Sequence, residues 1–162
     1  MNAMSNLILI GPMGAGKTTN GKWLARQLGK TFIDMDAYIE QKTGTGITHI
    51  FELEGEAGFR QREAAALAEI LANENQVIAT GGGSILLDAN RELMKRRGLV
   101  LYMHIPPEMQ LQRLLNDRKR PLLQTGDRAE RLQQLAAVRT PIYQSCADIK
   151  IDISRMPMSQ IR

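Results

Sequence analysis

The chain has 162 residues, of which 43% are hydrophobic and 23% are charged. This length suits one domain whose core needs no disulfide or metal to hold it, and the composition excludes an intrinsically disordered protein. The one cysteine, Cys146, cannot form an internal disulfide, and we expect an inert, partly buried thiol in a reducing compartment. The net charge of +4 fits an anionic small molecule as well as nucleic acid.

Short apolar runs that alternate with helical patterns predict the fold. We expect strands at residues 7–10, 31–33, 77–79, 99–103 and 149–153, separated by helical sequence. The helix before the third strand is predicted to bury Ala64, Leu67, Ala68 and Leu71 on one face. Strands separated by helices form βαβ units, so the sequence predicts one α/β domain. Its architecture would be a three-layer αβα sandwich around a five-stranded, mostly parallel sheet.

The first strand leads into a glycine-rich loop that opens a helix. Residues 11–18 read Gly-Pro-Met-Gly-Ala-Gly-Lys-Thr and match the phosphate-binding pattern G-x-x-x-x-G-K-[ST]. Glycines let the backbone curl so that its N–H groups point at phosphate oxygens, and the helix N-terminus adds partial positive charge. In this pattern Lys17 reaches the β- and γ-phosphates, and the Thr18 hydroxyl ligates Mg²⁺. An accidental glycine turn is the alternative, but the flanking strand and helix favour a P-loop that binds nucleotide.

Two carboxylates follow the second strand. Asp34 and Asp36 lie at its carboxyl end, where open α/β sheets bind ligands, and alternation along a strand would aim them the same way. Such a pair can divide the work, one holding Mg²⁺ through water and the other taking a proton from an attacking hydroxyl. The alternative is that Asp36 only caps the helix that follows.

Three consecutive glycines, Gly81, Gly82 and Gly83, follow the third strand at the same edge. Glycines weaken local structure through backbone entropy, so an ordinary turn seldom needs three of them. They would let a bare backbone approach a ligand and would offer N–H donors. A plain flexible loop is the alternative.

Arginines outside the P-loop are candidates for binding anionic groups. A guanidinium can grip a carboxylate with two parallel hydrogen bonds, and both Arg60 and Arg139 could do so, unless they are solvated surface charges. Residues 118–123 read Arg-Lys-Arg-Pro-Leu-Leu, a basic segment between helices. A lid at about 117–127 would exclude water and bring a cation to the transferring phosphoryl group. The alternative is a solvated run of charge.

Together these motifs resemble the shikimate kinase family of the nucleoside-monophosphate-kinase-like P-loop group. The matching blocks occur in the family's order and cover nearly the whole chain: residues 11–19, 34–36, 51–60, 79–83, 120–123 and 139–143. The P-loop alone is generic. Its combination with D-x-D, F-R, T-G-G-G, R-P-L-L and R-x-P-x-Y is highly specific.

The resemblance implies transfer of the γ-phosphoryl group of ATP to the 3-hydroxyl of shikimate, with Mg²⁺, in aromatic amino-acid biosynthesis. It implies one kinase domain over residues 1–162, with a substrate-binding helical region at about 36–62 and the lid at about 117–127. The implied ATP-binding residues are Gly14, Ala15, Gly16, Lys17, Thr18, Thr19, Arg113, Arg120 and Pro157. The implied shikimate-binding residues are Asp36, Arg60, Gly81, Gly82, Gly83 and Arg139.

The resemblance also implies individual roles. Thr18 and Asp34 would serve the metal, and Lys17, Asp36 and Arg120 would be catalytic. Asp36 is the candidate base, although a loose transition state needs little early deprotonation, so it could mainly orient the hydroxyl. Arg60 and Arg139 would clamp the shikimate carboxylate. Two further residues would form the walls of the adenine slot: Arg113 and Pro157.

Three alternatives stay open at this point: a related small-molecule kinase such as a gluconate kinase, a nucleotide-dependent switch or RNA-binding P-loop protein, and a non-catalytic nucleotide-binding module. The few aromatic residues, 4%, argue against an RNA surface. No secretory signal and no apolar stretch of membrane-spanning length is present. We therefore expect a cytoplasmic protein without nucleic-acid or membrane partners, and a monomer on family grounds alone.

Overall fold

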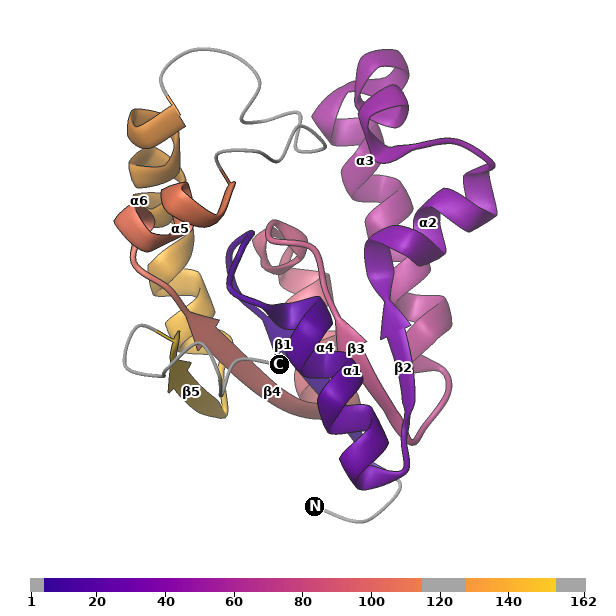
Figure 1. Cartoon of the computed structure of the whole chain (residues 1–162). Helices are drawn as coiled ribbons and strands as arrows, with labels where there is room; N and C mark the ends of the chain where they lie inside the picture. Colours follow the sequence, from indigo (N-terminus) through magenta and orange to yellow (C-terminus); the bar gives the residue numbers. More distant parts are fainter. Residues whose placement is uncertain (1–4, 115–127, 154–162) are drawn as a thin grey trace.

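A five-stranded parallel sheet forms the centre of the molecule (Figure 1). The computed structural model of the chain describes residues 5–114 and 128–153. The strands are β1 (Asn6–Ile10), β2 (Thr31–Asp34), β3 (Gln76–Ala79), β4 (Gly98–His104) and β5 (Ile149–Asp152). They are ordered β2-β3-β1-β4-β5, and every neighbouring pair is parallel. The predicted sheet is confirmed, and its carboxyl ends all meet at one edge.

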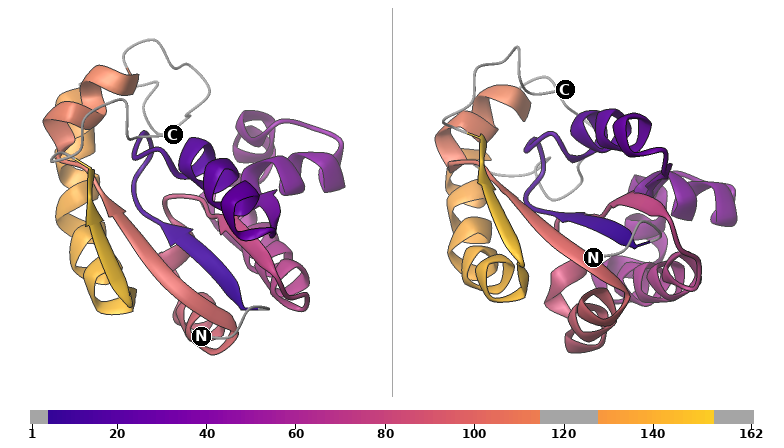
Figure 2. Two further views of the ribbon diagram at one scale, coloured as in Figure 1. Left: turned by 60° about the horizontal axis from the view of Figure 1, so that its bottom comes forward. Right: turned by 90° about the horizontal axis from the view of Figure 1, so that it is seen from below.

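Helices cover both faces of the sheet, as Figure 2 shows. They are α1 (Lys17–Leu28), α2 (Met35–Thr43), α3 (Ile47–Leu71), α4 (Asp88–Arg97), α5 (Pro107–Leu114) and α6 (Arg128–Cys146), with a 3₁₀ turn, η1, at Ser84–Leu86. Side chains of β1 alternate between the faces. Leu7 and Leu9 pack with α1, whereas Ile8 and Ile10 pack with α2, α3, α4 and α6. The predicted αβα sandwich is therefore confirmed.

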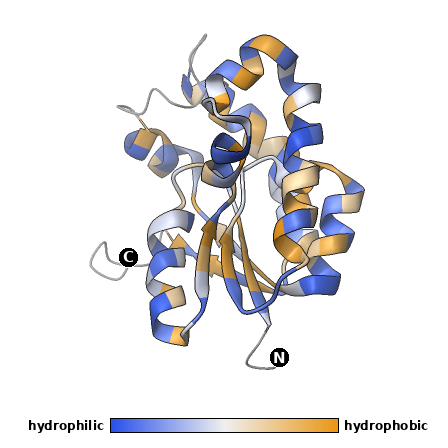
Figure 3. Cartoon of the chain, turned by 90° about the vertical axis from the view of Figure 1, so that its right-hand side faces the viewer, coloured by the Kyte–Doolittle hydropathy of each residue, from blue (hydrophilic) through white to orange (hydrophobic). Residues whose placement is uncertain are grey.

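Hydropathy follows these layers. Hydrophobic residues run along the strands, while the helices carry hydrophilic residues among the hydrophobic ones (Figure 3). All of β1 is buried, because it lies in the middle of the sheet between two helical layers.

Cys146, the last residue of α6, is buried, and this burial raises the pKa of its thiol, as expected of an inert cysteine. Among the helices of the described residues, none combines the length and apolar sequence needed to cross a bilayer.

Helix α3 departs from its predicted face. Leu67 and Leu71 are buried as expected, but Ala68 is exposed, so its placement in the core was wrong. The buried side of the helix instead carries a carboxylate, Glu63. At Gly55 the backbone has φ 71° and ψ −177°, a conformation that breaks the helical path and that glycine adopts readily.

Two predictions about domain organisation stay predictions. The proposed substrate-binding region at about 36–62 corresponds to α2 and the first part of α3. The proposed lid at 117–127 lies outside the described residues.

Candidate active site

The P-loop adopts the curled backbone that its glycines predict. Gly14 has φ 81° and Gly16 has φ 92°, which an L side chain rarely adopts. Gly16 is the N-cap of α1 and offers no side chain to its first N–H groups. Those donors, together with the positive end of the helix dipole, form a site suited to an anion.

Lys17 and Thr18 occupy the first turn of α1, next to a cleft of about 620 Å³. The Lys17 ammonium group donates to the carbonyl oxygen of Gly11, and to that of Pro12 at 3.0 Å. Thr18 and Thr19 are exposed on the cleft wall. The cleft thus presents a cation, hydroxyls and backbone donors together, as a bound phosphate chain requires.

Asp34 and Asp36 both line this cleft, although not for the predicted reason. Asp34 ends β2 and caps α2, because its Oδ1 accepts from the Ala37 N–H at 3.2 Å. Asp36 lies one residue inside α2, so the argument from alternation along a strand was wrong. The alternative that Asp36 is the helix cap was also wrong, because Asp34 has that role. The side chain of Asp36 is therefore not needed to begin the helix.

Thr18 and Asp34 form a pair of oxygen ligands suited to Mg²⁺. The Thr18 hydroxyl donates to Asp34 Oδ2 at 3.2 Å. Among residues 5–114 and 128–153 no group of three or more His, Cys, Asp and Glu side chains is placed to hold a metal. Protein-bound Mg²⁺ commonly keeps several waters and uses only one or two protein ligands together with substrate phosphates. The two oxygens present therefore fit this ion.

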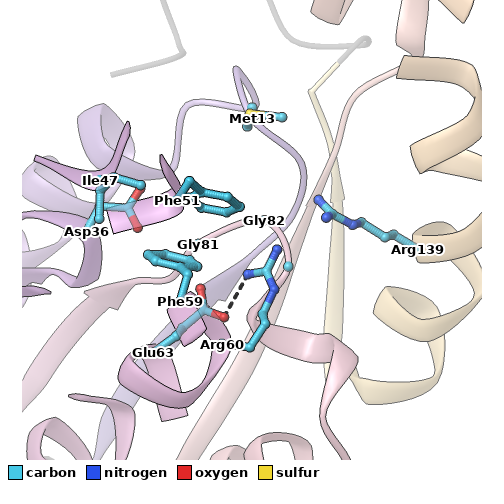
Figure 4. Close-up of a pocket in the computed structure, with 11 residues that line it drawn as sticks. Met13, Asp36, Ile47, Phe51, Phe59, Arg60, Glu63, Gly81, Gly82 and Arg139 are labelled. Carbon is cyan, nitrogen blue, oxygen red and sulfur yellow. Dashed lines mark hydrogen bonds and ion pairs between the residues drawn. The ribbon is translucent and has the colours of Figure 1, made fainter. Parts of the chain in front are cut away.

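A second pocket, of about 450 Å³, adjoins the phosphate cleft (Figure 4). Its apolar wall is formed by Met13, Ile47, Phe51 and Phe59, and its polar wall by Asp36, Arg60, Glu63, Arg139 and the three glycines. Four residues line both spaces: Met13, Asp36, Gly81 and Gly82. A group bound in this pocket would therefore face the phosphate cleft across Asp36.

Charged side chains pack closely against two of the three glycines after β3. A Cβ on Gly81 would lie 2.8 Å from Glu63 Oε2, and one on Gly83 would lie 2.5 Å from Arg60 Cζ. Both distances are shorter than a Cβ atom keeps from atoms to which it is not bonded. The alternative of a plain flexible loop is wrong, because this backbone forms the tightly packed floor of the pocket.

Arg60 is held in the pocket by a buried carboxylate. Its Nη1 donates to Glu63 Oε1 at 2.8 Å, and the Ser84 hydroxyl donates to Glu63 Oε2 at 3.0 Å. Glu63 is only 1% exposed. Burial raises the pKa of Glu63 above its usual value, against the opposing effects of Arg60 and Ser84, and nearby Asp36 raises it further. Burial of the ionised Glu63 carboxylate is therefore unfavourable, and the buried carboxylate fixes the position of the Arg60 guanidinium.

Arg139 enters the same pocket from α6 and is 6% exposed (Figure 4). Its Nη1 lies 3.3 Å from where a Cβ on Gly82 would be. The alternative that Arg60 and Arg139 are solvated surface charges is therefore wrong. Two guanidinium groups from distant parts of the sequence converge on one small pocket.

Of the two residues predicted to form the walls of the adenine slot, the structure describes Arg113. Arg113 lies in the last turn of α5, and its Nη1 donates to the carbonyl oxygen of Gly14 at 2.8 Å, which ties α5 to the P-loop. Its stacking on adenine stays a prediction. The predicted lid arginine, Arg120, and the opposite wall, Pro157, lie outside the described residues.

Comparison with known proteins decides the family. The family model described as "Shikimate kinase" matches residues 13–162. The chain belongs to the shikimate kinase family. A shikimate kinase of Halorhodospira halophila is 51% identical over 91% of this chain and 84% of its own. One of Thiobacillus denitrificans is 49% identical over 98% and 87% of the two chains. The resemblance seen in the motifs is thereby confirmed.

Solved structures agree with the family and separate it from a predicted alternative. A shikimate kinase from Acinetobacter baumannii in complex with shikimate superposes with a TM-score of 0.90, at 49% identity over 91% of this chain and 83% of that one. A gluconokinase from Sinorhizobium meliloti gives a TM-score of 0.59 at 17% identity, covering 99% and 89%. The second likeness shows a shared fold alone. The shikimate kinase structures therefore carry the comparison.

Sequence reasoning assigned no role to two side chains that contact the groups lining this shikimate kinase site. Glu63 recurs with Ala66, Leu67 and Ile70 at helical spacing, and a carboxylate on an apolar stripe, three residues after Arg60, was the available signal. Tyr143, on α6, donates its hydroxyl to the carbonyl oxygen of Gly82. Tyr143 is the last residue of the R-x-P-x-Y block, but its contact joins residues 61 positions apart, so the motif alone did not indicate the partner.

Proposed function

We propose that the two adjoining pockets transfer the γ-phosphoryl group of ATP to the 3-hydroxyl of shikimate, giving shikimate 3-phosphate and ADP. Family membership and relatives at about half identity bear out the enzyme class, an ATP-dependent kinase that acts on a hydroxyl of shikimate. The observation that supports these residue roles most strongly is the shared border of the pockets. Asp36 and Gly82 line both the cleft beside the P-loop and the pocket that holds two arginines.

On the nucleotide side, the P-loop and the start of α1 would hold the phosphates. Lys17 now donates to neutral carbonyl oxygens of the loop, and an anionic phosphate oxygen is a stronger partner for an ammonium group. The curled backbone at Gly14 and Gly16 supplies further donors. These groups would neutralise charge that spreads over the phosphoryl oxygens as transfer proceeds.

Thr18 and Asp34 would hold Mg²⁺ at the same cleft. When bound, this ion supplies positive charge to the phosphate oxygens and orients them. The protein's own contribution is the short distance between the hydroxyl and the carboxylate, 3.2 Å, which Asp34 maintains while it caps α2.

On the acceptor side, Arg60 and Arg139 would clamp the shikimate carboxylate while the ring packs on Phe51 and Phe59. The centroids of these two rings lie 4.8 Å apart, and both residues line the pocket. The 3-hydroxyl would then lie beside Asp36, at the border with the phosphate cleft. Its oxygen bonds to the γ-phosphorus as the bond from that phosphorus to the bridging oxygen of ADP breaks. Asp36 orients the hydroxyl and accepts its proton.

Removing either clamp arginine should weaken shikimate binding selectively. We expect Arg60→Ala and Arg139→Ala each to raise the KM for shikimate about 10- to 100-fold, the effect of losing hydrogen bonds to a charged group. The KM for MgATP should change less than about twofold. Arg62→Ala is the matched control, since Arg62 lies on the same helix but pairs with Glu54, which does not line the pocket. An unchanged shikimate KM would remove that arginine from the clamp.

Glu63 should make shikimate binding sensitive to acid. Its pKa is raised, so as the pH falls it gains a proton at a higher pH than an ordinary glutamate and no longer holds Arg60 as an ion pair. The KM for shikimate should therefore rise as the pH falls through this raised pKa. Glu63→Gln should raise the KM about 10-fold at neutral pH and remove the part of the pH dependence that belongs to this group.

The stability of Glu63→Gln provides a second check, because ionised Glu63 is expected to favour shikimate binding but to lower the stability of the fold. Because the folded-state pKa is raised, ionised Glu63 lowers the free energy of unfolding, and this cost disappears as the pH falls. Glu63→Gln should therefore bind shikimate poorly at neutral pH without a lower melting temperature. A variant that loses binding and melting temperature together would show that Glu63 is only a structural residue.

The function is tested by ADP release from MgATP with a panel of acceptors. Shikimate, quinate, gluconate and nucleoside monophosphates would be compared at equal concentration, with a reaction that contains no acceptor. We expect release with shikimate alone to rise well above the reaction without acceptor. A higher kcat/KM with gluconate, or equal release without any acceptor, would refute the assignment.

A further inference from the structure

Tyr143 has a buried hydroxyl at the centre of the acceptor side of the site. The residue is 2% exposed, and its hydroxyl donates to the carbonyl oxygen of Gly82 at 2.5 Å. Arg139 precedes it by one helical turn on α6, so both side chains lie on the same face of the helix. Burial raises the pKa of Tyr143, while the charge of Arg139 and a hydrogen bond from it act in the opposite direction.

The backbone at Gly82 meets both side chains at once. A Cβ on Gly82 would lie 3.3 Å from Arg139 Nη1 and 3.7 Å from the Tyr143 hydroxyl oxygen. The guanidinium, the phenol and the glycine backbone therefore form one compact contact. Figure 4 shows two of its members, with Arg139 reaching from α6 toward the Gly82 backbone.

The ring of Tyr143 is itself fixed from the sheet. It stacks on Tyr102 of β4, with ring centroids 5.0 Å apart and an interplanar angle of 23°. The hydroxyl of Tyr102 does not bind Gly82: it lies 2.9 Å from His104 Nδ1 and also forms a hydrogen bond with Thr140 of α6. Stacking on the sheet residue Tyr102 thus fixes the position of the Tyr143 ring and its hydroxyl. The hydroxyl in turn holds the Gly82 backbone, which lies against Arg139.

We propose that Tyr143 is a positioning residue for acceptor binding, whose hydroxyl holds the Gly82 backbone and the Arg139 guanidinium in one arrangement. This inference rests on the proposed function of Arg139 as part of the carboxylate clamp. Without the hydroxyl, the Gly82 carbonyl loses its donor, and the guanidinium loses a fixed neighbour. The clamp would then have to be ordered by the substrate itself, which costs affinity.

Tyr143→Phe tests the inference, because phenylalanine keeps the stacked ring and removes only the hydroxyl. We expect the KM for shikimate to rise about 5- to 10-fold, the effect of one lost hydrogen bond in the site. The kcat and the KM for MgATP should stay within about twofold. Tyr102→Phe is the matched control, since Tyr102 is also a buried residue, and its hydroxyl contacts His104 and Thr140 rather than the Gly82 backbone. Its shikimate KM should remain near that of the unaltered protein.

A double variant distinguishes positioning through Arg139 from general loosening. In an Arg139→Ala background, Tyr143→Phe should lower kcat/KM for shikimate by less than about twofold, because the clamp is already lost. Equal effects in both backgrounds would overturn the inference, as would a Tyr143→Phe variant that behaves like Tyr102→Phe. If the unaltered protein releases no ADP with shikimate, the proposed function fails instead.

Discussion

Replacement of Lys17 with alanine is expected to lower kcat by about 10³-fold or more, the scale of removing a preorganised charge from a developing anion. The ammonium group is part of the P-loop itself, where it donates to the carbonyl oxygens of Gly11 and Pro12. No other described lysine lines the phosphate cleft. The measurement is ADP release at saturating MgATP and shikimate.

The matched control for this variant is Lys22→Ala. Lys22 lies on the same helix, α1, and is exposed. Its replacement removes the same charge from the protein and should leave kcat within about twofold. Activity of Lys17→Ala near that of Lys22→Ala would reject the assignment of the P-loop as the nucleotide site.

Asp36→Asn should have the second large effect, a loss of about 10²- to 10⁴-fold in kcat if its carboxylate accepts the proton of the acceptor hydroxyl. The change keeps the shape of the side chain and leaves the cap of α2 in place, since Asp34 supplies it. MgATP should still bind with unchanged affinity, because Asp36 lies where the cleft borders the acceptor pocket and the proposed phosphate and metal groups belong to other residues.

The size of this loss separates two roles for Asp36. In a loose transition state the hydroxyl needs little early deprotonation, so an orienting carboxylate would contribute less than a general base. Glu74→Gln removes an exposed carboxylate just before β3, at the opposite end of that strand from the site, and serves as control. A kcat for Asp36→Asn equal to that of the control would show that its carboxylate is dispensable.

Local signals were sufficient for the sheet and the P-loop. Four or five apolar residues in a row can only be a strand buried on both faces or part of a buried helix, and the glycine after Ile10 favours the strand. The positive φ angles at Gly14 and Gly16 follow directly from the spacing of the motif. In such segments the type of each residue is enough to predict its backbone conformation.

The details of the acceptor pocket depend on contacts that no local pattern contains. Strand β2 was expected to end at residue 33 and ends at Asp34, which also caps α2, so the alternation of the strand does not extend to Asp36. Arg60 lies only three residues from Glu63, but Ser84, the further partner of Glu63, and Gly82, the partner of Tyr143, are brought close by the fold. Membership of a family could indicate which residues matter, but not which side chains hold them in place.

The most direct test of this account is a crystal structure of the protein with ADP and shikimate bound together. We expect the diphosphate in the curled loop before α1, and the shikimate carboxylate on both Arg60 and Arg139. The 3-hydroxyl should lie beside Asp36 and point toward the nucleotide. Shikimate bound outside this pocket, or with its carboxylate away from both guanidinium groups, would contradict the account.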